Sequence, residues 1–132
     1  MSKRRASCVC GQLSVLCEGE PVRTSICHCL ACQQRTGSVF GVQARFPRGQ
    51  THIEGRATQY VRIADSGNRA RFSFCPVCGA TVYWEPEALP DFVAVAVGAF
   101  ADPQFPSPQV SVYEERCHPW AAMPDMKIEH LR

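Results

Sequence analysis

Seven of the nine cysteines in this 132-residue chain fall into three close groups, and a cysteine thiolate can act as a nucleophile or as a metal ligand. The groups are Cys8-Val9-Cys10, Cys27-His28-Cys29-Leu30-Ala31-Cys32 and Cys75-Pro76-Val77-Cys78. Disulfide bonds suit them poorly, because the number of cysteines is odd and close neighbours in sequence do not bridge comfortably. Metal binding is therefore the favoured use of these cysteines.

The first and third groups each supply one pair of ligands. On an extended chain Cys8 and Cys10 point to the same face, with Cα atoms about 6.5–7 Å apart. Cys75 and Cys78 flank a tight turn, after which Gly79 accepts unusual backbone angles. Together the two pairs predict a closed, structural zinc site, because tetrahedral zinc takes four thiolates and its binding stabilises the fold. The alternatives are a frayed, reactive N-terminal pair and an iron–sulfur cluster.

The middle group offers three thiolates, from Cys27, Cys29 and Cys32, which is one ligand fewer than a closed zinc site needs. A zinc ion with an open position is typical of catalytic sites, so this group is the candidate catalytic centre. His28 lies between two of these cysteines on a predicted strand, and its side chain is expected on the opposite face. The alternatives are an empty site or a second closed site, completed by Cys17, Cys117, His28 or His118.

Short segments rich in β-branched and aromatic residues, separated by glycine and proline, must position these cysteines. Strands are predicted over residues 12–17, 22–28, 39–46, 58–63, 69–74, 81–84, 92–98 and 110–114. Residues 92–97 are apolar on both faces and are expected in the middle of the core. The one predicted helix is a turn or two near residues 30–35. We therefore expect a single all-β domain over residues 1–132, built of small packed antiparallel sheets.

Charge and hydropathy argue against two classes of partner. The formal net charge of +2 is too small to indicate a nucleic-acid or membrane surface. No apolar run approaches the roughly 20 residues that would span a bilayer. The basic residues at the start lead into cysteines and not into an apolar signal segment. We therefore expect a soluble, cytoplasmic protein with no nucleic-acid and no membrane partner.

The order and spacing of the grouped cysteines resemble the family of glutathione-dependent formaldehyde-activating enzymes, also called the GFA or CENP-V domain family. The matching motifs are Cys8-Val9-Cys10-Gly11, Cys27-His28-Cys29-Leu30-Ala31-Cys32 with Thr36-Gly37 after it, Phe74-Cys75-Pro76-Val77-Cys78-Gly79, and Pro119-Trp120 near the end. The resemblance implies an Mss4-like fold of the β-tent type. It also implies a structural zinc on Cys8, Cys10, Cys75 and Cys78, and a second, solvent-accessible zinc on Cys27, Cys29 and Cys32.

The same resemblance implies a carbon–sulfur lyase activity, written in the direction that adds the thiol of glutathione to formaldehyde to give S-hydroxymethylglutathione. The expected partners are then a small-molecule thiol such as glutathione and a small aldehyde, and the expected cofactor is zinc, up to two ions per chain. Arg35 is the first candidate to bind a substrate carboxylate, because a guanidinium fork suits that group. Arg45, Arg69 and Arg71 are weaker candidates for the same role.

Two functions without catalysis remain as alternatives. One is a zinc-stabilised binding module whose arginines contact nucleic acid or a partner protein. The other is a metal-handling protein that exchanges the ion of the three-cysteine group. His118 and Trp120 could line a substrate pocket, although a place in the core is the favoured expectation for Trp120. Cys117 is expected as an ordinary buried thiol. Exposed strand edges are compatible with a monomer or a homodimer.

Overall fold

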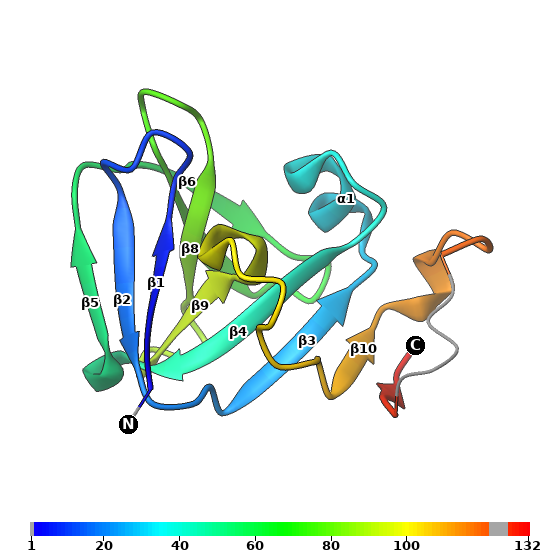
Figure 1. The fold of residues 1–132 in the computed structure, drawn as a ribbon. Coiled ribbons are helices and arrows are strands. Elements are labelled where there is room, and N and C mark those ends of the chain that lie inside the picture. Colours follow the sequence, from blue (N-terminus) through cyan, green and yellow to red (C-terminus); the bar gives the residue numbers. More distant parts are fainter. Residues whose placement is uncertain (1, 122–126) are drawn as a thin grey trace. The chain divides into compact units, whose positions relative to one another are not determined.

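The computed structural model describes residues 2–121 and 127–132, and these consist mainly of β-strands (Figure 1). Over these residues it contains eleven strands, one α-helix and three short 3₁₀ helices. The all-β prediction is therefore confirmed. The chain folds as two compact units. Unit 1 consists of Met1–Val22 and Ala44–Phe105, and unit 2 consists of Arg23–Gln43 and Pro106–Arg132. A single domain over residues 1–132 stays a prediction.

One antiparallel sheet of unit 1 consists of β1 (Lys3–Ser7), β2 (Ser14–Glu18) and β5 (Thr51–Glu54). β2 lies in the middle, where Val15 pairs with Ala6 on one side and with Ile53 on the other. β1 and β5 were not among the predicted strands, because β1 begins with three basic residues, which disfavour a strand, and β5 has only four residues. β1 forms because pairing with β2 buries Ala6 completely.

The remaining strands of unit 1 are hydrogen-bonded side by side in the order β4 (Gly41–Pro47), β9 (Phe92–Ala96), β8 (Thr81–Pro86), β7 (Arg69–Phe74) and β6 (Thr58–Ile63). β4 belongs to unit 1 from Ala44 onward. The 3₁₀ helices η1 (Arg48–Gln50) and η2 (Val97–Phe100) follow β4 and β9. β9 is buried on both faces, as predicted. Val93 and Val95 belong to the main core with Phe46, and Ala94 packs with Phe72 and Trp84.

Unit 2 contains β3 (Arg23–Cys27), α1 (Leu30–Thr36), β10 (Val110–Val112), η3 (Glu114–Arg116) and β11 (Glu129–His130). β10 pairs in parallel with both β3 and β11, and Ser111 lies opposite Ile26 and His130. These two parallel pairings differ from the antiparallel sheets that the sequence predicts. Parallel strands need a long connection between them, and most of unit 1 lies between β3 and β10 in the sequence.

Helix α1 begins directly after Cys29, whose Sγ accepts a hydrogen bond from the backbone N–H of Cys32 at 3.3 Å. This contact satisfies one of the N–H groups that the first turn of any helix leaves without a partner. The helix ends at Thr36, one residue beyond the predicted segment. Among the helices that the structure describes, none is long and apolar enough to cross a membrane.

Candidate metal centres

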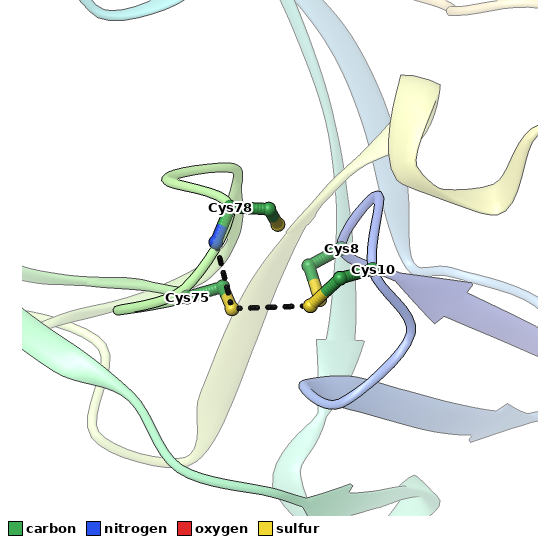
Figure 2. A group of neighbouring side chains, drawn as sticks. All are labelled: Cys8, Cys10, Cys75 and Cys78. Atoms are coloured by element: carbon green, nitrogen blue, oxygen red, sulfur yellow. Dashed lines mark hydrogen bonds between the residues drawn. The ribbon is translucent and has the colours of Figure 1, made fainter.

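Four cysteine sulfurs of unit 1 converge, although they come from two distant parts of the sequence (Figure 2). Cys8 and Cys10 lie in the turn that follows β1, and Cys75 and Cys78 lie in the turn between β7 and β8. All four Sγ atoms lie within 4.8 Å of one another. The Sγ of Cys10 is 3.6 Å from the Sγ of Cys8 and 3.6 Å from that of Cys75. The two predicted pairs thus meet as one four-sulfur centre.

Backbone hydrogen bonds shape the two turns that carry these sulfurs. The N–H of Gly11 donates to the carbonyl of Cys8 at 3.1 Å, and the N–H of Gly79 donates to the carbonyl of Cys75 at 2.8 Å. Gly79 has a φ of +79°, in the left-handed region that glycine adopts at low cost. The role that the sequence suggests for this glycine is therefore confirmed.

N–H donors surround the buried sulfur of Cys75. The side-chain amide of Gln12 donates to it at 3.0 Å, and the backbone N–H groups of Val77 and Cys78 donate at 3.3 and 3.4 Å. Burial raises the pKa of Cys75, but these donors outweigh burial and hold the pKa at about 6, below the ordinary 9.0. The thiolate, which is the metal-binding form, is thus favoured at neutral pH. Four converging sulfurs with such donors fit a tetrahedral zinc ion.

Gln12 belongs to this centre, yet nothing in the sequence singles it out. Its Nε2 also donates to the carbonyl of Arg56 at 2.7 Å, and its Oε1 accepts from the N–H of Arg56 at 3.0 Å. The chain passes close by at Gly55, where a Cβ atom would lie 1.8 Å from the carbonyl oxygen of Gln12. Gln12 therefore links the segment around residue 56 to the sulfur of Cys75. The residues next to Gln12 in the sequence give no indication of this contact, because its partner is 44 residues away.

Replacing Gln12 with alanine is expected to weaken metal binding at the four-sulfur centre without unfolding the chain. Loss of a hydrogen-bond partner of a metal ligand typically lowers metal affinity about 10–100-fold. Competition with a chromophoric chelator measures the change in zinc affinity. Gln34→Ala, on the exposed side of α1, is the matched control. An unchanged affinity in Gln12→Ala would mean that Gln12 only holds the neighbouring turn.

Three further sulfurs converge in unit 2, where β3 ends and α1 begins. The Sγ atoms of Cys27, Cys29 and Cys32 lie within 4.8 Å of one another. Within residues 2–121 and 127–132, no fourth Cys, His, Asp or Glu side chain joins this group. Hydrogen bonds with Cys29 and Cys32, followed by burial, raise the pKa of Cys27. The raised pKa favours the protonated thiol. A divalent cation between the sulfurs would favour the thiolate instead, because its positive charge stabilises the anion. Three thiolates fit zinc with one position left open.

His28 lies between two of these cysteines in sequence but does not join them. The residue is only 3% exposed, its Nε2 is 3.0 Å from the Oγ of Ser111, and its ring packs edge-on against Phe40. Burial lowers the pKa of His28, while the charge of Glu114 opposes that shift. His28 is thus a hydrogen-bonded core histidine, as its position in the sequence predicts.

Arg35, the first candidate for carboxylate binding, is half-buried in the last turn of α1. A Cβ atom on Gly41 would lie 2.8 Å from the Nη2 of Arg35, so the guanidinium packs against the Gly41 backbone. The weaker candidates, Arg45 on β4 and Arg69 and Arg71 on β7, belong to unit 1. Arg35 is therefore the one of the four that shares a unit with the three-sulfur centre.

Two residues near the end of the chain differ from their expected placement. Trp120 is 73% exposed, so its prediction as a core residue is wrong, and Cys117 is half-buried instead of fully buried. Both lie in the segment of turns and irregular backbone that follows η3. The indole packs edge-on against the ring of His118, with ring centres 5.8 Å apart.

The mainly β fold and the two sulfur centres define the chain as a small β protein with two candidate metal sites. The chain belongs to the glutathione-dependent formaldehyde-activating enzyme family, whose model matches residues 3–116. A crystal structure of a Rhodobacter sphaeroides protein is similar in fold at 15% sequence identity, with a TM-score of 0.57 over 97% of this chain and 99% of that chain. No curated protein matches the chain. The family is one of enzymes, which supports an enzymatic role in coarse terms.

Proposed function

We propose that the protein is a zinc-dependent enzyme of the carbon–sulfur lyase type, which adds a small-molecule thiol, glutathione or a similar one, to formaldehyde or a related small aldehyde. Family membership supports the reaction class. The observation that carries the proposal is the group of Cys27, Cys29 and Cys32, which no fourth ligand of the described residues completes. A site with three thiolates has a position for a ligand from outside the chain.

In this proposal Cys27, Cys29 and Cys32 hold the catalytic zinc, and Cys8, Cys10, Cys75 and Cys78 hold the structural one. Zinc bound by these three thiolates would supply a lowered pKa for an incoming thiol and a fixed position for its sulfur. Formaldehyde adds thiols readily in water, so the protein needs to contribute only about three powers of ten in rate, or roughly 4 kcal/mol. Arg35 binds a carboxylate of the thiol substrate and orients it.

The decisive experiment follows formaldehyde disappearance with the zinc-loaded protein in the presence of glutathione and of other small thiols. Thiol-dependent turnover above the uncatalysed addition is expected with at least one of them. Glutathione should be preferred if its carboxylates contribute to binding, and its methyl esters should then react more slowly. No acceleration with any thiol, in a protein that contains zinc at the three-sulfur centre, would contradict the proposed function.

Elemental analysis of the purified protein should find two zinc ions per chain. The two ions are expected to respond differently to a mild chelator, because four ligands release an ion more slowly than three. One ion should be lost readily together with the activity, and the other should be retained by the folded chain. Loss of both ions at the same rate would contradict the distinction between a structural and a catalytic centre. Ready exchange of one ion in an inactive protein would favour metal handling.

A further inference from the structure

The side chain of Gln33 has a single possible amide orientation, because its hydrogen bonds determine which end is oxygen. Its Nε2 lies 2.9 Å from the carbonyl oxygen of His28 and 3.1 Å from the carbonyl oxygen of Arg116. Carbonyl oxygens only accept hydrogen bonds, so the atom between them must be the NH₂ group. Both of its protons are then used, and the Oε1 of Gln33 is left as an acceptor.

This orientation determines the tautomer of His118. The Nε2 of His118 lies 2.9 Å from the Oε1 of Gln33, which can only accept. The proton of a neutral His118 must therefore be on Nε2, and its Nδ1 must carry a lone pair. Within residues 2–121 and 127–132, the structure gives His118 no hydrogen bond from the ring other than this one. The Nδ1 of His118 is thus an acceptor without a partner in the described part of the chain.

Hydrogen bonds of the same glutamine connect His118 to the segment that carries the three-sulfur centre. Gln33 follows Cys32 directly in α1, and its backbone N–H donates to the carbonyl of Cys29 at 3.1 Å. Its side chain binds the carbonyl of His28, the residue between Cys27 and Cys29. One hydrogen bond therefore joins the ring of His118 to the side chain of Gln33, which is itself hydrogen-bonded to the backbone between Cys27 and Cys29. The exposed indole of Trp120 packs against the ring and adds an apolar surface beside it.

We propose that His118 is a catalytic residue that accepts the proton of the substrate thiol at Nδ1, a role that rests on the proposed function. The proton leaves the sulfur for Nδ1 as the sulfur forms a bond to the aldehyde carbon. The electron pair of the carbonyl π bond moves to the oxygen, which then takes the proton back from Nδ1. Thiol and formaldehyde thus give the S-hydroxymethyl adduct, and His118 returns to its neutral form. Gln33 is the positioning residue, because it keeps the proton of the neutral ring on Nε2.

His118→Gln is the variant that separates this role from a structural one. The amide nitrogen of the new glutamine can occupy the position of Nε2 and keep the hydrogen bond to Gln33, but the side chain has no basic nitrogen in place of Nδ1. We expect kcat/KM for thiol-dependent formaldehyde loss to fall on the order of 100-fold, with unchanged zinc content and thermal unfolding. His52→Gln, an exposed histidine of β5, is the matched control and should retain the wild-type rate.

Long-range ¹H–¹⁵N NMR correlation of the zinc-loaded protein supplies a readout that does not depend on activity. The ring signals of His118, assigned by their loss in His118→Gln, should show the Nε2–H tautomer at a pH where the ring is neutral. The Nδ1–H tautomer, or a wild-type kcat/KM in His118→Gln, would overturn the assignment of His118 while the proposed function stands. Absence of thiol-dependent turnover in the wild-type protein would instead overturn the proposed function, and the role of His118 with it.

Discussion

Cys78→Ser is expected to give an insoluble or protease-sensitive chain that lacks one zinc ion. The change removes one of the four sulfurs that join the turn after β1 to the turn between β7 and β8. Binding of structural zinc contributes on the order of 10 kcal/mol in small domains, which is comparable with the whole stability of a folded protein. A hydroxyl in place of the thiolate should remove most of this contribution. Limited proteolysis and zinc analysis of any soluble fraction measure the effect.

Val77→Ser is the matched control, because Val77 lies in the same turn with its side chain exposed. Val77→Ser also introduces a serine into this turn but removes no sulfur, so a soluble protein with the wild-type zinc content is expected. A Cys78→Ser protein that is as stable as Val77→Ser would contradict a structural role for the four-sulfur centre. Zinc content that is equal in both variants would remove Cys78 from the ligands.

Cys29→Ser is expected to abolish thiol-dependent activity in a chain that remains folded and keeps about one zinc ion. Cys29 has two roles, because its Sγ belongs to the three-sulfur centre and also accepts the N–H of Cys32 at the start of α1. Serine is a favourable N-cap residue, so the hydroxyl should preserve the helix start while removing the thiolate. The rate should fall by about the three powers of ten that the proposed mechanism assigns to the protein.

Ala31→Ser tests whether any such loss follows from changing the first turn of α1 itself. Ala31 lies between Cys29 and Cys32 in sequence and contributes no sulfur to the three-sulfur centre. Its replacement should leave the zinc content at two and the rate near that of the wild type. Circular dichroism and elemental analysis verify that both variants are folded and count their zinc. Full activity in Cys29→Ser would remove the three-sulfur centre from the reaction.

The sequence allowed the ligand-type residues to be predicted because spacing is a local property. Cysteines two or three residues apart have few ways to point, and a glycine after Cys78 is readable as a backbone requirement. The strand at residues 58–63 and the helix after Cys29 were also predictable, because each depends on the residue types within its own short segment. In contrast, β1 was missed, because its charged sequence becomes a strand only when β2 lies beside it.

The sequence by itself determined the family, the all-β class and the cysteines of the two candidate metal centres. Only the tertiary structure decided which distant side chains serve those groups, such as Gln12 at the sulfur of Cys75 and Gln33 between His28 and His118. It also decided that β10 pairs in parallel and that Trp120 is exposed. A hydrogen bond between residues far apart in the chain depends on how the whole backbone folds, whereas the geometry of closely spaced cysteines depends on a few consecutive dihedral angles.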